Sequence, residues 1–224
     1  MSAINCNIDI KHLSRVEGHG NLKIRIKDAI VKEARWEVVE TARFFEKMLA
    51  GKKFNNLPFI SSRICGICSI SHNLTAIRAI ENCFGFTPSV QTQRLRLLLK
   101  HMETLQSHIL HIFFLAAPDY FGEDSFLPFS VSHPDVTNMA LRLKMLANDL
   151  ADEVGGRRLH PTTPVVGGFS KIPGKKNLGK FKYRLQSSLL DLIKSSTLLK
   201  KFEIPQFSRE TEYVASIPRI PTLL

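Results

Sequence analysis

Two cysteines that are separated by two residues and followed by a histidine could bind a metal ion. They are Cys65, Cys68 and His72, in the segment RICGICSISH. Two thiols three positions apart can bind one ion from a tight turn, and Gly66 lets the backbone fold around it. A helix that begins at Cys68 and the neighbouring Arg63 would both favour the thiolate form. On that helix the His72 ring lies above Cys68, where it would bind the metal or donate a hydrogen bond to the sulfur.

The cysteine pattern alone leaves three interpretations open. A structural zinc site needs four ligands, for which the chain offers Cys65, Cys68, His72 and Cys83, but no second ligand pair follows at zinc-finger spacing. A thioredoxin-like redox pair would follow a strand of a βαβ unit, and residues 58–62 make a poor strand. The third interpretation is that the cysteines only pack in the core, which is unusual at this spacing.

Two further segments contain residue types that occur in functional sites. In SRVEGHG, Glu17 stands between Arg15 and His19, as expected for a carboxylate in a buried polar network or for an ordinary surface acid. The later segment GGRRLHPTTPVVGG contains His160 and is rich in glycine and proline. It is either a rigid loop with two solvated arginines or a functional loop.

Alternating residues near the N-terminus predict the element that must position Glu17. Residues 21–27 and 34–38 alternate between apolar and polar side chains, which is typical of an antiparallel hairpin with one solvated face. The apolar side chains expected to point inward are Leu22, Ile24, Ile26, Ala34, Trp36 and Val38. We therefore predict a small β-element over about 7–40.

Helical periodicity dominates the rest of the chain. Pro118 is expected to end the longest helix, and Gly155 with Gly156 the next one. A long loop is expected over 155–179. The predicted helices cover 42–50, 69–84, about 91–115, 136–154 and about 183–202.

The composition is that of an ordinary globular protein. The chain has 224 residues, 44% hydrophobic and 23% charged, which excludes wholesale disorder, and its four cysteines are too few for a disulfide scaffold. The net charge of +11 favours an acidic partner surface, but no nucleic-acid reading element accompanies the basic residues. No apolar run reaches membrane-spanning length and no signal peptide is evident, so we expect a soluble chain without a membrane span in a reducing compartment.

Together and in this order, these segments resemble the large subunit of nickel–iron hydrogenases of the cytoplasmic, multi-subunit kind. The Arg-x-Cys-Gly-x-Cys-x3-His motif is highly specific, and the resemblance covers about residues 8–214. It implies an α+β, mainly α fold, with a small N-terminal antiparallel β-element followed by a helical bundle. The matching residues are RVEGH at 15–19, RICGIC at 63–68 with His72, the stretch from SH to AAPD at 107–119, and HP and GG within 160–168.

The resemblance implies the metals and their ligands. Cys65 would be a terminal thiolate on nickel, and Cys68 would bridge nickel to an iron that carries cyanide and carbon monoxide. Soft thiolates suit such a redox-active centre. Glu46, 19 residues before Cys65, stands where the family places a carboxylate ligand of a magnesium ion.

The resemblance also implies what surrounds the metals. Glu17 matches the family's proton-relay glutamate, which takes the proton from heterolytic H2 cleavage. His72 would hydrogen-bond a cysteine sulfur, and Arg63 and His19 would lie near the centre without binding metal. His160 matches a histidine near the first iron–sulfur cluster of the small subunit. The implied partners are that iron–sulfur small subunit, further electron-transfer subunits, and H2 or protons as substrate, in the cytoplasm.

The sequence departs from the family in its length. Family members continue for roughly as long again and end in a second Cys-x2-Cys that supplies two more nickel ligands, whereas no cysteine follows Cys83. We therefore expect residues 1–224 to be the N-terminal part of a single large-subunit domain, incomplete at its C-terminus, with a β-element at about 7–40 and a helical body at about 41–214. Such a chain is expected to be inactive alone. The alternatives are an inactive scaffold that binds electron-transfer partners, or a small zinc-binding module.

Overall fold

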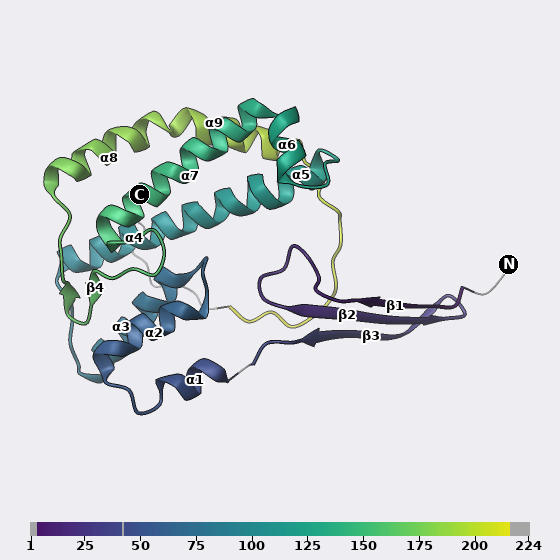
Figure 1. Cartoon of the computed structure of the whole chain (residues 1–224), viewed down its shortest axis with the longest axis horizontal. Coiled ribbons are helices and arrows are strands. Elements are labelled where there is room, and N and C mark those ends of the chain that lie inside the picture. Colours follow the sequence, from purple (N-terminus) through teal and green to yellow (C-terminus); the bar gives the residue numbers. More distant parts are fainter. Residues whose placement is uncertain (1–3, 42, 216–224) are drawn as a thin grey trace.

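A three-stranded sheet projects from a larger helical body in the computed structural model, which describes residues 4–41 and 43–215 (Figure 1). The α+β, mainly α fold expected from the sequence is confirmed. The strands are β1 (Cys6–Ile10), β2 (Gly20–Lys27) and β3 (Ile30–Val38), antiparallel in the order β1-β2-β3.

The predicted hairpin forms, and its apolar residues lie opposite one another, Leu22 with Trp36 and Ile24 with Ala34. Strand β1 also alternates and pairs with the edge of β2 that faces away from β3, where Ile8 lies opposite Ile24. The apolar side chains of all three strands therefore share one face.

The expected burial of this face is only partly correct. The apolar residues of β2 are half-buried, but Trp36 and Val38 on β3 are 48% and 68% exposed. In the described part of the chain the sheet extends away from the helices, so no element covers β3 (Figure 1). One close approach is specific: a Cβ atom at Gly20 would come within 2.6 Å of the Trp36 ring, so a larger residue there would require that ring to move.

The helical body contains the predicted helices with several corrections, and residue 42 of the first predicted helix lies outside the described residues. Its α-helices are α1 (Phe44–Leu49), α2 (Leu57–Ser61), α3 (Ser69–Cys83), α4 (Val90–Ile109), α5 (Ala117–Tyr120), α6 (Phe126–Ser132), α7 (Pro134–Gly155), α8 (Lys175–Ser187) and α9 (Leu189–Leu199). Two short strands, β4 (Pro164–Val165) and β5 (Gly168–Phe169), lie between α7 and α8. Short turns of helix are η1 (Phe54–Asn56), η2 (Ser62–Ile64) and η3 (Leu110–Ala116).

Three helix boundaries differ from the prediction. The long helix does not end at Pro118, because a π-helical turn, η3, follows α4 and Pro118 then occupies the first turn of α5, where a missing N–H is tolerated. The predicted last helix is two helices, since the hydroxyl of Ser188 bonds back to Leu185 O at the break. α8 begins at Lys175, inside the predicted loop.

The core lies mainly between α4 and α7, which run side by side (Figure 1). Fully buried alanines along α7 allow close approach of the two helices. One cluster of buried side chains comprises Ile70, Leu99, Met102, Leu150, Ala151 and Val154, with Leu178, Phe181 and Leu185 of α8 packed against it. These apolar contacts explain why the lysine-rich segment that starts at Lys175 is helical.

A buried ion pair connects α3, α4 and the β4–β5 hairpin. Arg96 donates two hydrogen bonds of 2.7 Å to Glu81, whose side chain is 3% exposed. The same groups bind the hairpin, because Gly167 N–H donates to Glu81 and Arg96 donates to Val165 O. Burial alone would raise the pKa of Glu81, but the hydrogen bonds from Arg96 and Gly167 outweigh burial and hold that pKa below its usual value.

The helices of the described residues are all too short or too polar to span a bilayer. α9, an apolar helix near the C-terminal end, has only 11 residues. A span needs about 20 apolar residues.

Candidate metal centre

The cysteine pair forms a turn that ends at the first residue of α3. Cys65 is extended after η2, and Cys68 occupies the N-cap position of α3. Backbone N–H groups of Ile67 and Cys68 donate to Cys65 Sγ, with N–S distances of 3.3 and 3.1 Å. Both cysteines are free and half-buried. The backbone thus holds the first sulfur in an environment of N–H donors, which suits a thiolate ligand.

Glu17 meets Cys65 across 48 positions of sequence. The Cys65 thiol donates to Glu17 Oε1 at 3.5 Å. Glu17 comes from the loop between β1 and β2 and is an exposed residue. The family resemblance implies Glu17 beside the first nickel ligand, and the two side chains do lie together, while the role of Glu17 stays a prediction.

Glu103 is a site residue that sequence reasoning missed. This α4 carboxylate is 3% exposed and accepts the backbone N–H groups of Ile70 (2.7 Å) and Ser71 (3.0 Å) at the start of α3. It also accepts the Ser71 hydroxyl and the Lys100 ammonium. Glu103 therefore caps α3 from another helix, directly after Cys68. The sequence signal that could have identified Glu103 as buried is its spacing: it lies four residues after the core residue Leu99, on the same face of α4.

His160 contacts residues on either side of the cysteine turn, although it lies at least 91 positions further along the chain. Its backbone N–H donates to Ser69 Oγ at 2.9 Å, and its ring Nδ1 lies 2.9 Å from Ser62 O, so Nδ1–H is the donor. Its φ of +53° is strained for a residue with a side chain. His160 thus contacts the residues that flank the turn on both sides.

The other expected site residues make no described hydrogen bond to the thiols through their side chains. His72 lies in the first turn of α3, close in sequence to Cys68. The hydrogen bonds described for it are made by its backbone N–H and C=O groups. Arg63 is exposed and forms no ion pair with a described residue. The ring of His19 binds Glu40 at 3.2 Å, and Glu46 binds Arg43 at 2.6 and 2.8 Å. Placement of His19, Arg63 and Glu46 near a metal therefore stays a prediction.

A four-ligand zinc site that includes Cys83 is wrong for geometric reasons. Cys83 is the last residue of α3 and Cys68 precedes its first, so they are separated by roughly 22 Å of helix. Across the described ranges, no three Cys, His, Asp or Glu side chains converge on one point. Cys65 and Cys68 are soft donors that fit nickel or iron, but they supply two ligands.

The expected ionisation of Cys68 is also corrected. Burial raises the pKa of the Cys68 thiol to about 12, with further contributions from Cys65 and the negative charge of Glu103. The helix dipole and Arg63 do not outweigh these effects. The metal-free thiol is therefore protonated at neutral pH, and a metal ion must displace that proton on binding.

We expect Cys68 in the metal-free chain to react with iodoacetamide at pH 8 about 100-fold more slowly than the exposed Cys83, because only the thiolate is nucleophilic. The rate at Cys68 should rise about tenfold per pH unit as the pH approaches its pKa. Peptide mass spectrometry after timed alkylation measures both rates in one sample. Equal rates at pH 8 would contradict the raised pKa.

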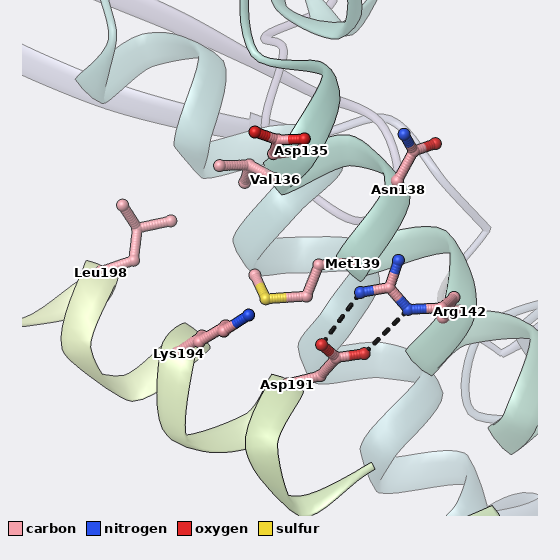
Figure 2. A pocket seen from close by; sticks show the side chains of 8 residues that line it. All are labelled: Asp135, Val136, Asn138, Met139, Arg142, Asp191, Lys194 and Leu198. Carbon is pink, nitrogen blue, oxygen red and sulfur yellow. Dashed lines mark hydrogen bonds and ion pairs between the residues drawn. The ribbon is translucent and has the colours of Figure 1, made fainter. Parts of the chain in front are cut away.

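An open cavity lies away from the cysteine turn. It measures about 520 Å³ and opens between α7 and α9, where Figure 2 shows Arg142 bonded to Asp191 with Met139 and Lys194 nearby. None of the predicted site residues lines it. The chemistry of the cysteine turn therefore does not depend on this cavity.

The amino-acid sequence of this chain is similar to those of known proteins. The family model of nickel-dependent hydrogenases matches residues 43–133. The alpha subunit of sulfhydrogenase 1 of Pyrococcus furiosus is 40% identical over 182 residues, which cover 81% of this chain and 42% of that protein. The alpha subunit of coenzyme F420 hydrogenase of Methanosarcina barkeri is 32% identical over 168 residues, covering 72% of this chain and 37% of that protein. This chain spans less than half the length of these relatives.

Solved structures show the same likeness. An NAD+-reducing NiFe hydrogenase in the H2-reduced state has a TM-score of 0.82 and 27% identity, covering 89% of this chain and 46% of that one. The NiFeSe hydrogenase of Desulfomicrobium baculatum has a TM-score of 0.74 and 26% identity, covering 88% and 45%. The sheet and helices described above are thus those of part of a larger known fold.

Proposed function

Because the chain belongs to the nickel-dependent hydrogenase family, as the N-terminal part of its large subunit, we propose that it carries half of the protein ligands of a nickel–iron centre for reversible H2 oxidation. One juxtaposition carries this proposal: two thiols in one turn, Cys65 and Cys68, with the Glu17 carboxylate 3.5 Å from the first sulfur. A metal-binding pair beside a proton acceptor is what heterolytic H2 cleavage requires.

The two cysteines would hold the metals. Cys65 would be a thiolate ligand of nickel, and Cys68 would be a thiolate ligand of nickel and of iron. When bound, the centre would supply the Lewis-acid and redox chemistry of H2 cleavage, with cyanide and carbon monoxide as further ligands of the iron. Cys68 must lose its proton to bind, and Glu103 keeps the start of α3 fixed while it does so.

Glu17 would take the proton released by H2 cleavage and return it in the reverse direction. Its carboxylate contacts the Cys65 sulfur on one side and solvent on the other, so a proton accepted at Oε1 has a short way out. His72 would support the centre by a hydrogen bond to a cysteine sulfur, with Arg63 and His19 near it.

Three proposals concern the periphery of the site. Glu46 would bind magnesium, which requires it to release Arg43. His160, held by Ser62 through Nδ1, has Nε2 left for a contact with an iron–sulfur small subunit. Electrons would pass through that subunit to further electron-transfer subunits, and the assembly would work in the cytoplasm.

The remaining two thiolates would come from another segment or chain, and residues 1–224 would form part of a single large-subunit domain. A second candidate function, an inactive scaffold for electron-transfer partners, is favoured by one observation: in the described ranges no group of three or more His, Cys, Asp or Glu side chains is placed to hold a metal ion.

Metal analysis of the protein purified from its source, with whatever copurifies, tests the proposal. Nickel and iron in near-equal amounts together with an iron–sulfur partner would support it. Absence of nickel would instead support the scaffold, and one zinc per chain would support a zinc-binding protein.

In the assembled enzyme, Glu17→Gln is expected to lower H2 turnover about 100-fold, because an amide cannot accept the proton. Nickel content should be unchanged, since Glu17 is not proposed as a ligand. The matched control is Glu33→Gln, on the exposed strand β3. H2 uptake assayed with equal nickel loading measures the effect, and an unchanged turnover would remove Glu17 from the mechanism.

A further inference from the structure

Few polar contacts join the N-terminal segment to the helical body. Among the described residues, side-chain hydrogen bonds and ion pairs cross from residues 4–41 to the helices at two places: Glu17 with Cys65, and Arg15 with Asp119. The sheet itself extends away from the helices (Figure 1). The position of Glu17 is therefore not fixed by packing of the sheet.

The loop that carries Glu17, residues 11–19, is closed at its base by the rings of His12 and His19, which lie edge to face with centroids 6.3 Å apart. Its described hydrogen bonds to the neighbouring strands lie at its two ends, as in Leu13 N–H to Gly20 O. Three of its residues have positive φ: His12 (+55°), Arg15 (+61°) and Gly18 (+86°). For Arg15 this backbone conformation is unfavourable and needs an outside contact to hold it.

Asp119 supplies that contact. Arg15 Nε and Nη2 donate to the two carboxylate oxygens of Asp119 at 3.2 and 3.1 Å, a two-point arrangement that fixes direction as well as distance. Asp119 stands on α5 directly after Ala117 and Pro118, which are both buried, so it is a rigid point of attachment. The hydrogen bond also raises the pKa of Arg15, which keeps the guanidinium charged.

We propose that the Arg15–Asp119 ion pair positions Glu17 against Cys65. Arg15 is two residues from Glu17, so a fixed Arg15 limits how far the carboxylate can move from the sulfur. Arg15 and Asp119 are then positioning residues, neither of which touches Cys65 in the structure. The geometric part of this proposal is independent of metal, and its catalytic meaning rests on the proposed function.

Cross-linking in the metal-free full chain tests the geometry. A Glu17→Cys variant, with Cys6, Cys68 and Cys83 replaced by Ser, leaves two thiols, at positions 17 and 65. Dibromobimane joins thiols a few ångströms apart, and peptide mass spectrometry gives the rate of the 17–65 cross-link relative to single alkylation of Cys65. Adding Asp119→Asn is expected to lower this relative rate about fivefold, the upper range for exposed ion pairs.

A second ion pair of the same geometry provides the control. Arg142 binds Asp191 through two hydrogen bonds of 2.9 and 3.0 Å between α7 and α9 (Figure 2). Asp191→Asn should change the cross-linking rate less than twofold, because this pair is outside the Glu17 loop. The charge swap Arg15→Asp with Asp119→Arg should restore at least half of the lost rate.

Three results would overturn the proposal: an unchanged rate with Asp119→Asn, an equal fall with Asp191→Asn, or no recovery in the charge swap. If far-UV circular dichroism shows that Asp119→Asn does not fold, Asp119→Glu replaces it, with a smaller fall expected. In the assembled enzyme, Asp119→Asn should lower kcat about fivefold at unchanged KM and nickel content. Absence of nickel would defeat the proposed function and leave the cross-linking result intact.

Discussion

A Cys68→Ser variant is expected to contain no nickel and to show no H2 uptake when assembled with its partner. Serine is a hard oxygen donor with a far higher pKa than a thiol, so it cannot replace the soft thiolate that the proposed function assigns to nickel and iron. The loss should exceed about 1,000-fold, larger than that of Glu17→Gln, because the centre does not form. Elemental analysis and H2 uptake on the same preparation measure both quantities.

Cys83→Ser is the matched control for this variant. Cys83 lies on the same helix as the site, at its far end, and is exposed. Its replacement should leave nickel content and H2 uptake unchanged. Normal nickel in Cys68→Ser would show that the metal binds elsewhere, and equal losses in both variants would indicate a general effect of removing cysteine from α3.

Arg96→Met is expected to reduce the free energy of unfolding by about 3–5 kcal/mol. The substitution leaves the Glu81 carboxylate buried without its partner, and it removes the bond to Val165 O that holds the β4–β5 hairpin. Urea unfolding followed by circular dichroism measures the change at neutral pH, where Glu81 is ionised in both the folded and the unfolded chain.

Two further variants test whether the loss of stability in Arg96→Met comes from the unpaired charge of Glu81. Arg142→Met breaks a more exposed ion pair and should cost no more than about 1 kcal/mol. Glu81→Leu combined with Arg96→Met removes both charges and should recover at least half of the loss, although Gly167 N–H then lacks its acceptor. A loss below about 1 kcal/mol in Arg96→Met alone would mean that the pair is not a stabilising link between α3 and α4.

Local patterns predicted much of the fold. The alternation around Leu22 and Trp36 predicted the hairpin and the face that its apolar side chains share, and Gly156, in a left-handed conformation with φ +74°, ends α7 as expected. These features depend on residues close in sequence, so they can be inferred without knowing the rest of the structure. The helix boundaries at Pro118 and Lys175 could not be inferred in this way. The π-helical turn η3 carries the helix past the first of them, and contacts of α8 with the core determine the second.

The cysteine turn is the part of the candidate site that the sequence by itself determined. Its residue types, the spacing of Cys65 and Cys68, and the start of α3 at Ser69 follow from ten consecutive residues. Which distant residues meet that turn was decided only by the tertiary structure. Glu103 caps the helix from 32 and 33 positions away, and His160 braces it from 91 and 98.

The reason is physical. A helix start or a strand register is stabilised by neighbours along the chain, whereas a buried carboxylate is stable only where distant donors meet it, as Glu103 is met by the N–H groups of α3. The raised pKa of Cys68 arises in the same way, from burial and from a charge on another helix. The sequence states which chemical groups are available, and packing of the helices decides which of them meet.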